Sequence, residues 1–196
     1  MSTAQKSILL IIFVLVIDQA SKIFIKLNFA LGENVHVFDW FKIYFIENNG
    51  MAFGMEFIGK LFLTLFRIVA VTGLVYFIHR LIVNNARTGY VLSVSLLLAG
   101  AAGNIFDSVF YGVLFSESHG MAATILPETG GYAPLFYGKV VDMLYFPIIK
   151  NGMGETIFFS PIFNIADSAI TIAVIIILIF FRKDLNDSLE SKKNEE

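Results

Sequence analysis

The chain has 196 residues, of which 57% are hydrophobic and only 15% are charged. Soluble domains carry about 45–50% apolar and about 25% charged residues, so this composition excludes the soluble, disordered and fibrous classes. A net charge of -2 leaves no basic face for nucleic acid, and the lack of cysteine removes thiol nucleophiles, thiolate metal sites and disulfides. The composition predicts one integral membrane domain over residues 1–182, followed by a charged, disordered cytoplasmic tail at 183–196.

Four windows are apolar over the length of about 20 residues that a membrane-spanning helix needs. They cover residues 7–26, 61–83, 90–110 and 162–181, in round terms. The first window could instead be a signal peptide, but the polar run DQASK at 18–22 makes a poor cleavage site and the apolar pattern resumes after it. A retained span is favoured, and the predicted fold class is an all-α membrane protein with four transmembrane helices.

The basic residues that flank the spans indicate the orientation of the chain. They gather on one side of the membrane: Lys6, Arg80, Arg87, Arg182, Lys183, Lys192 and Lys193. Both termini are therefore expected in the cytoplasm, with the segments 27–60 and 111–161 outside. Residues 34–45 alternate apolar and polar types and are rich in aromatic and β-branched side chains, which predicts short strands. The second segment is rich in Gly and Pro, which predicts loops.

Three of the four spans contain an aspartate: Asp18, Asp107 and Asp167. A charge at the bilayer centre costs about 2.5–3.5 kcal/mol on the lenient insertion scale, so such residues usually face a protein interior and have a function. At about 1.5 Å per residue, each of the three falls in the outer half of the membrane. Asp142 lies in an apolar patch of the outer segment just before the last span. The topology predicts that these four carboxyls converge on one site near the outer leaflet.

Helical spacing pairs these acids with other polar side chains. Both members of each pair share a helix face: Asp18 with Lys22, Asn104 with Asp107, and Asn164 with Asp167. The small residues AGAAG at 99–103 favour close helix packing.

Five short motifs follow one another along the chain. They are DQASK at 18–22, NNGMAFG at 48–54, GNIFD at 103–107, VVD at 140–142 and FNIADS at 163–168. Each is weak alone, but the five in this order on four spans resemble the lipoprotein signal peptidases (signal peptidase II), a family of bacterial intramembrane aspartyl proteases.

The resemblance implies a role for each motif residue. Asp142 and Asp167 would be the catalytic pair. The resemblance further implies that Asn48, Gly50, Asn104 and Asn164 hold the substrate backbone and the pair, with Asp18, Lys22 and Asp107 as supporting polar contacts. The turn containing Asn48 and Gly50 is expected to reach back to the pair; the alternative is an ordinary Asn-Gly hairpin turn.

The chemistry of such a pair follows from its charges. Two carboxyls that share a site hold one proton between them. One acts as base on a water molecule, and the other stabilises the oxyanion that forms at the scissile carbonyl. This reaction requires no metal or cofactor, and His36, His79 and His119 lack metal-ligand spacing.

The chain departs from the family pattern in two places. The family usually has Arg directly after the aspartate of the third motif, where this chain has Ser108. About 30 residues also separate Phe110 from Asp142, a gap that is normally short. We expect the segment 111–138 to lie over the outer mouth of the site as a lid or a binding surface; the alternative is a solvated insertion without a role.

The predicted function is removal of the signal peptide from diacylglyceryl-modified prolipoproteins, by cleavage before the lipidated Cys of the substrate. The expected partners are that substrate and membrane lipids, without nucleic acid, at the bacterial inner membrane. The main alternative is a proton- or cation-coupled transporter, which would have acids through the full membrane depth and usually repeated halves. A small structural subunit would leave the Asn–Asp pairs unexplained.

Overall fold

The computed structural model describes residues 1–49, 59–150, 156–158 and 161–190. Its helices are α1 (Thr3–Asn28), α2 (Lys60–Val83), α3 (Thr88–Phe106), α4 (Gly112–Leu114), α5 (Ile165–Phe180) and α6 (Arg182–Glu190), with a π-helical turn η2 (Asp107–Tyr111) between α3 and α4. Its strands are β1 (Asn34–Phe38), β2 (Phe41–Asn48), β3 (Val140–Tyr145), β4 (Ile149–Lys150), β5 (Thr156–Phe158) and β6 (Ile162–Phe163).

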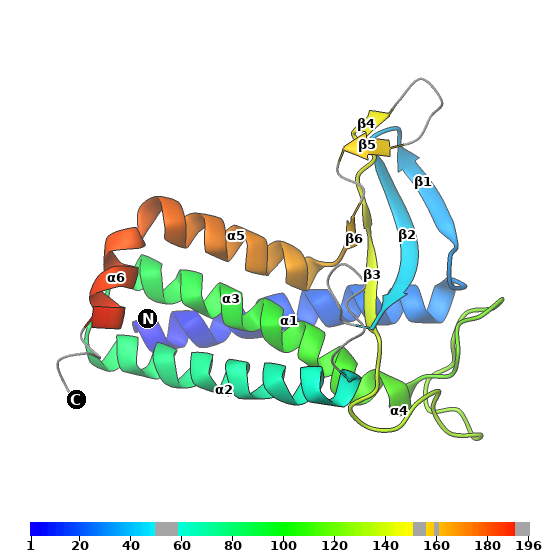
Figure 1. The fold of residues 1–196 in the computed structure, drawn as a ribbon, viewed down its shortest axis with the longest axis horizontal. Coiled ribbons are helices and arrows are strands. Elements are labelled where there is room, and N and C mark those ends of the chain that lie inside the picture. Colours follow the sequence, from blue (N-terminus) through cyan, green and yellow to red (C-terminus); the bar gives the residue numbers. More distant parts are fainter. Residues whose placement is uncertain (50–58, 151–155, 159–160, 191–196) are drawn as a thin grey trace.

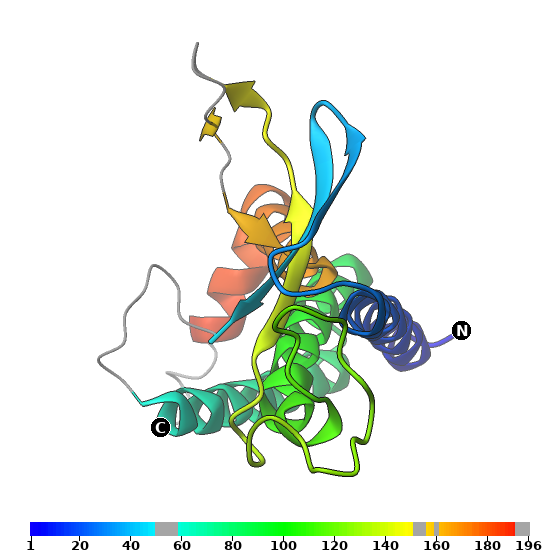
Figure 2. The same ribbon diagram turned by 90° about the vertical axis from the view of Figure 1, so that its right-hand side faces the viewer.

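The helices α1, α2, α3 and α5 run side by side, and a small sheet stands at one end of this bundle (Figure 1). The start of α1 and the helix α6 lie at the opposite end. Figure 2 views the molecule from the sheet end, where the strands cross in front of the helix ends. This arrangement agrees with the predicted helical membrane protein that carries a small β-region.

Three segments are long and apolar enough to cross a membrane: α1, α2 and the continuous stretch Thr88–Leu114. The bent pair α5 and α6, with 87° between its helices, is a fourth candidate. The predicted boundaries of the last span were wrong, because β6 occupies its first residues and α5 begins only at Ile165. The prediction of a disordered tail was also wrong in part, since Arg182–Glu190 is helical.

The sheet has the antiparallel order β1-β2-β3-β6 and brings distant parts of the chain together. The register sets Asn48 of β2 opposite Val140 and Ile46 opposite Asp142 of β3. On the other side of β3, Leu144 pairs with Phe163 of β6, which leads directly into α5. The sheet therefore joins the two chain segments that carry Asp142 and Asp167.

The helix α3 lies in the centre of the bundle, and small residues let its neighbours approach. A side chain at Gly100 would collide with the backbone of Ala166 on α5. At Gly103 a Cβ atom would lie 2.6 Å from Oδ2 of Asp18 on α1. The small-residue run at 99–103 thus has the packing role predicted for it.

Candidate active site

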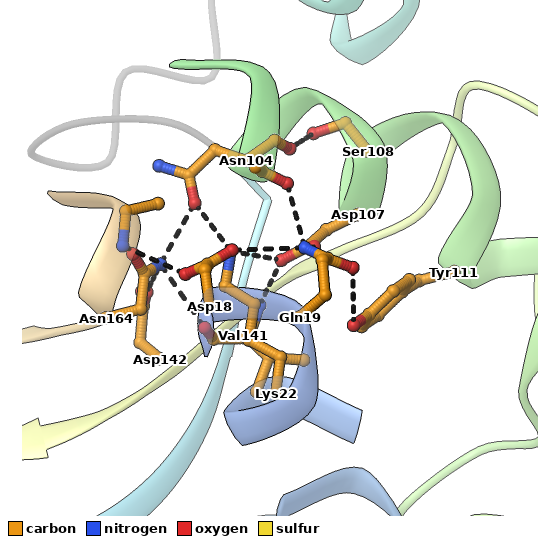
Figure 3. A network of polar contacts seen from close by, with 12 residues as sticks. Asp18, Gln19, Lys22, Asn104, Asp107, Ser108, Tyr111, Val141, Asp142 and Asn164 are labelled. Atoms are coloured by element: carbon orange, nitrogen blue, oxygen red, sulfur yellow. Dashed lines mark hydrogen bonds and ion pairs between the residues drawn. The ribbon is translucent and has the colours of Figure 1, made fainter. Parts of the chain in front are cut away.

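A buried ion-pair centre lies where α1 meets the end of α3 (Figure 3). The ammonium of Lys22 is 2.9 Å from Oδ2 of Asp18 and 2.9 Å from Oδ2 of Asp107. It also donates to Oδ1 of Asn104 at 2.9 Å. The spacing of four residues along α1 brings Asp18 and Lys22 together as predicted. Burial of these charges is tolerated because each has an opposite partner.

Gln19 and Tyr111 complete this centre, although no role was predicted for either residue. The Gln19 amide donates to Oδ1 of Asp107 at 2.8 Å and to the carbonyl of Gly103 at 3.2 Å. The Tyr111 hydroxyl donates to Oε1 of Gln19 at 3.1 Å (Figure 3). Gln19 belongs to the quoted DQASK motif, but no local spacing in the sequence pointed to Tyr111.

Ser108 stands where the family usually has Arg, and its hydroxyl donates to the carbonyl of Asn104 at 3.0 Å. Asp107 therefore receives its positive partner from Lys22 on α1. It also accepts from the backbone N–H of Val141 at 3.3 Å, which ties the end of α3 to β3.

Two asparagine amides connect the two carboxyls that the sequence predicts to be catalytic. Asn164 donates to Oδ1 of Asp142 at 2.7 Å and to Oδ1 of Asn104 at 3.0 Å. Asn104 in turn donates to Oδ1 of Asp167 at 2.7 Å. These hydrogen bonds link Asp142 of β3 to Asp167 of α5 through the side chains of Asn164 and Asn104, so both carboxyls share one polar environment.

Asp142 is deeply buried, with 2% of its surface exposed. Besides Asn164, the Asn48 amide donates to its Oδ2 at 3.3 Å. Burial, first, and the neighbouring Asp167, second, together raise the pKa of Asp142 to about 7. A carboxyl with this pKa retains a proton over much of the neutral range.

Asp167 lies on the first turn of α5, where Asn164 is the N-cap. The Asn164 side chain accepts from the Asp167 backbone N–H at 2.8 Å, and Oδ2 of Asp167 accepts from the Asn164 N–H at 3.4 Å. This reciprocal capping box satisfies two N–H groups at the helix start. The predicted Asn164–Asp167 pair is therefore a helix cap as well as a link between the carboxyls.

A second lysine of α1, Lys26, is also buried. Its ammonium is 2.6 Å from Oε1 of Glu47 and donates to the Ser118 hydroxyl at 2.8 Å. Burial alone would raise the pKa of Glu47, but bonds from Lys26 and Lys139 outweigh it and hold that pKa below its ordinary value. Since Glu47 precedes Asn48 on β2, these contacts position the strand that reaches Asp142.

The insertion 111–138 is built into the core on this side of the sheet. Phe115, Ser118 and Ala123 are buried, and the Ala123 N–H donates to the carbonyl of Lys26 at 2.8 Å. The alternative of a purely solvated insertion was wrong for these residues. The lid or binding-surface role stays a prediction.

The sequence-predicted site residues that the structure describes lie in one connected network: Asp18, Lys22, Asn48, Asn104, Asp107, Asp142, Asn164 and Asp167. Gly50 lies outside the described residues. Within the described part of the chain, no three acidic or histidine side chains gather so as to hold a metal ion. The network occupies one end of the bundle, which disfavours an ion path through the full depth of the membrane.

A multi-span helix bundle with two amide-linked carboxyls at one end has the design of a membrane-embedded aspartic peptidase. Comparison with known proteins identifies which one. The sequence model of signal peptidase (SPase) II matches residues 10–183. The chain belongs to the signal peptidase II family, which confirms the resemblance predicted from the five motifs.

Known relatives agree with this assignment over nearly the whole chain. The lipoprotein signal peptidase of Porphyromonas gingivalis is 46% identical over 194 residues, which cover 94% of this chain and 86% of the relative. That of Amoebophilus asiaticus is 32% identical over 199 residues, covering 92% and 79%. A solved bacterial membrane enzyme, determined by the in meso method at 2.3 Å, is 30% identical with a TM-score of 0.65, covering 93% of this chain and 91% of that one.

Proposed function

We propose that this enzyme removes the signal peptide from diacylglyceryl-modified prolipoproteins, by cutting before the lipidated Cys of the substrate, with Asp142 and Asp167 as its catalytic pair. Family membership supports the reaction. The observation that carries the site assignment is the shared set of amide donors, because Asn104 and Asn164 bridge the two carboxyls. The basic residues at the span ends support a site at the outer leaflet of the bacterial inner membrane, with both termini in the cytoplasm.

The pair acts on water without forming a covalent intermediate. The ionised carboxylate takes a proton from the water, whose oxygen attacks the scissile carbonyl carbon. The carbonyl oxygen gains negative charge and is stabilised by the proton of the other carboxyl. Collapse of the tetrahedral intermediate releases the new carboxyl end of the signal peptide and the amino group of the lipidated Cys.

The surroundings of Asp167 suit a lipidated substrate. An apolar hollow of about 380 Å³ lies beside this residue. Pro161, Phe163, Thr171 and Ile172 line it together with the carboxylate and Ser168. Acyl chains in this hollow would hold the modified Cys near the pair without leaving the outer leaflet.

Cleavage of a lipidated prolipoprotein by the purified protein, followed by gel shift, tests the proposal. We expect Asp142→Asn and Asp167→Asn each to abolish cleavage while the protein stays folded, and the double variant to lose little more, because the two groups act as a unit. Asp39→Asn is the matched control, since the Asp39 side chain is fully exposed.

Substantial cleavage by either single variant would contradict the aspartyl assignment. Equal cleavage of a substrate without the lipid would contradict the proposed substrate class. An Asn48→Ala variant with full turnover at low substrate concentration would remove Asn48 from the site.

A further inference from the structure

A groove of about 240 Å³ runs between α2, α3 and α5 and begins at Asp167. One face of each helix lines it, as the spacing of three and four residues requires. Its polar residues are Arg67, Asn104 and Asp167, and its apolar wall includes Ala70, Leu74 and Ile170. Asn104 and Asp167 already belong to the catalytic network, and Arg67 lines the same groove.

Arg67 is an unusual residue for its position on α2. It lies seven residues after the start of the helix, about 10 Å along its axis. Its neighbours Phe66 and Val69 are exposed apolar residues of a lipid-facing helix. Arginine inside a span costs about 2.5–3.5 kcal/mol even on the lenient scale, so it normally marks a function and has a named partner.

The partner on the groove side is Asp167. The Arg67 side chain is partly buried and lies close enough to the Asp167 carboxylate to interact with it electrostatically. Among the described residues that line this groove, Arg67 is the one with a positive charge. Lys22 on α1 is occupied by the carboxylates of Asp18 and Asp107.

The two carboxyls of the pair therefore have different surroundings. Asp142 is buried on β3, where it accepts from the neutral amides of Asn48 and Asn164. Lys22 also acts on it electrostatically, but that ammonium is shared with the carboxylates of Asp18 and Asp107. Asp167 lies at the N-terminus of α5, accepts from the Asn104 amide and faces Arg67. A helix N-terminus, a hydrogen-bond donor and a guanidinium all favour a negative charge.

We propose that Arg67 is a positioning residue that holds Asp167 as the ionised carboxylate, so that Asp167 is the base and Asp142 carries the shared proton. This inference rests on the proposed function. The water proton passes to Asp167 while the water oxygen bonds to the carbonyl carbon and the carbonyl oxygen takes the proton from Asp142. The proton on Asp167 then goes to the leaving nitrogen as the C–N bond breaks, and Asp142 regains its proton from the intermediate.

The pH dependence of cleavage tests this assignment. Among the described residues, the titratable groups near Asp167 are Arg67 of α2, Asp142 of β3, and Asp18 and Lys22 of α1. Loss of a nearby cation raises the pH at which a carboxyl ionises, by about 1–3 units for a close pair. For Arg67→Gln we expect the acidic limb of kcat/KM to move at least about one unit toward higher pH, with KM nearly unchanged.

Two matched variants separate charge from packing. Arg67→Lys keeps the positive charge and should leave the acidic limb close to that of the unmodified protein. Arg80→Gln removes a cation from the same helix, thirteen residues further on and about 20 Å away, and should leave the limb in place. A rise in KM with an unmoved limb would mean that Arg67 binds substrate and would overturn the proposal. An equal loss of activity at every pH, with lower thermal stability, would mean a structural role and would also overturn it.

Infrared difference spectroscopy tests the proton assignment without changing Arg67. At neutral pH the protonated carboxyl band should disappear in Asp142→Asn and remain in Asp167→Asn. The reverse result would overturn the proposal even if Arg67→Gln failed to fold. The proposed function fails separately, if the unmodified protein does not cleave lipidated prolipoprotein or if the Asp→Asn variants retain activity.

Discussion

Two buried lysines lie one helical turn apart on α1, and the protein neutralises them in different ways. Lys22 lies between the carboxylates of Asp18 and Asp107, both of which belong to the helix bundle. Among the residues that the structure describes, Lys26 forms an ion pair with one carboxylate, that of Glu47. Its ammonium is surrounded by aromatic rings at 4.9–5.8 Å, those of Phe45, Phe115 and Tyr132.

The difference follows from what each lysine joins. Lys22 links α1 to the end of α3, within one helix bundle, where two carboxylates face one ammonium. Lys26 links α1 to β2 and to the insertion, and its rings attract the cation while they exclude water. The first lysine therefore stabilises the helices next to the proposed catalytic pair, and the second fixes β2, which reaches Asp142 through Asn48, and the insertion.

The largest expected effect is that of Lys22→Met. The variant leaves two buried carboxylates close together without their cation, and breaking a buried ion pair costs about 3–5 kcal/mol. Thermal unfolding in detergent should show a large fall in Tm. Adding Asp107→Asn to this variant should recover part of the lost Tm, because one of the two unpaired charges is removed. A Lys22→Met protein as stable as the original would mean that the centre contributes no net stability.

Gly103→Ala tests the same centre through packing. The added methyl group would lie 2.6 Å from Oδ2 of Asp18, so that carboxylate must move from its place beside Lys22 or α1 must move away from α3. Overpacking of this kind costs about 1–3 kcal/mol. Gly73→Ala is the matched control, because nothing lies within 4 Å of its Cβ position on α2. That change should leave stability equal or slightly higher. Equal Tm changes in the two variants would contradict close approach at Gly103.

Lys26→Met should cost less than Lys22→Met, about 1–2 kcal/mol. The methionine chain still packs against the aromatic rings, and Glu47 keeps Lys139 at 3.0 Å. Removing Lys139 as well should cost more than the sum of the single changes, because Glu47 then loses both ammonium groups. Additive losses, measured by thermal unfolding, would show that the two lysines do not share Glu47.

The smallest effect concerns the pH dependence of stability. The pKa of Asp142 is raised to about 7 in the folded protein, so the folded state binds its proton more tightly than the unfolded state does. The stabilisation from this carboxyl is fully present below its unfolded pKa of about 3.9 and is lost as pH rises through the folded pKa. Between pH 6 and 8 the loss of unfolding free energy is about 1 kcal/mol. Asp142→Asn should unfold with a flatter pH dependence over that range. An unchanged slope would contradict the raised pKa.

Local spacing explains which parts of this site the sequence predicted. The pair Asp18 and Lys22 and the pair Asn164 and Asp167 each lie within one helical turn, so helix geometry alone brings them together. The motif order then indicated that distant pairs belong to one site. Asn48 was predicted to approach the catalytic pair, and its amide does bond to Asp142.

The missed residues depend on tertiary geometry. Tyr111 lies at the end of the π-helical turn η2 and reaches Gln19 on another helix, a contact that local spacing does not indicate. Arg67 lines one groove with Asp167 of α5, which no spacing along α2 could indicate. The start of the last span was wrong for a similar reason, since Ile162 and Phe163 are apolar enough for a helix but pair with β3 instead.

The shortness of α5 has a consequence for the bilayer. Its 16 residues measure about 24 Å, less than the hydrocarbon thickness of about 30 Å that a span must cross. We expect the membrane to thin locally around a helix this short. Thinning would draw the headgroups and their hydration water toward the first turn of α5, where Asp167 lies. The helix that carries one of the two proposed catalytic carboxyls would thereby bring water, the second reactant of hydrolysis, into a bilayer that otherwise excludes it.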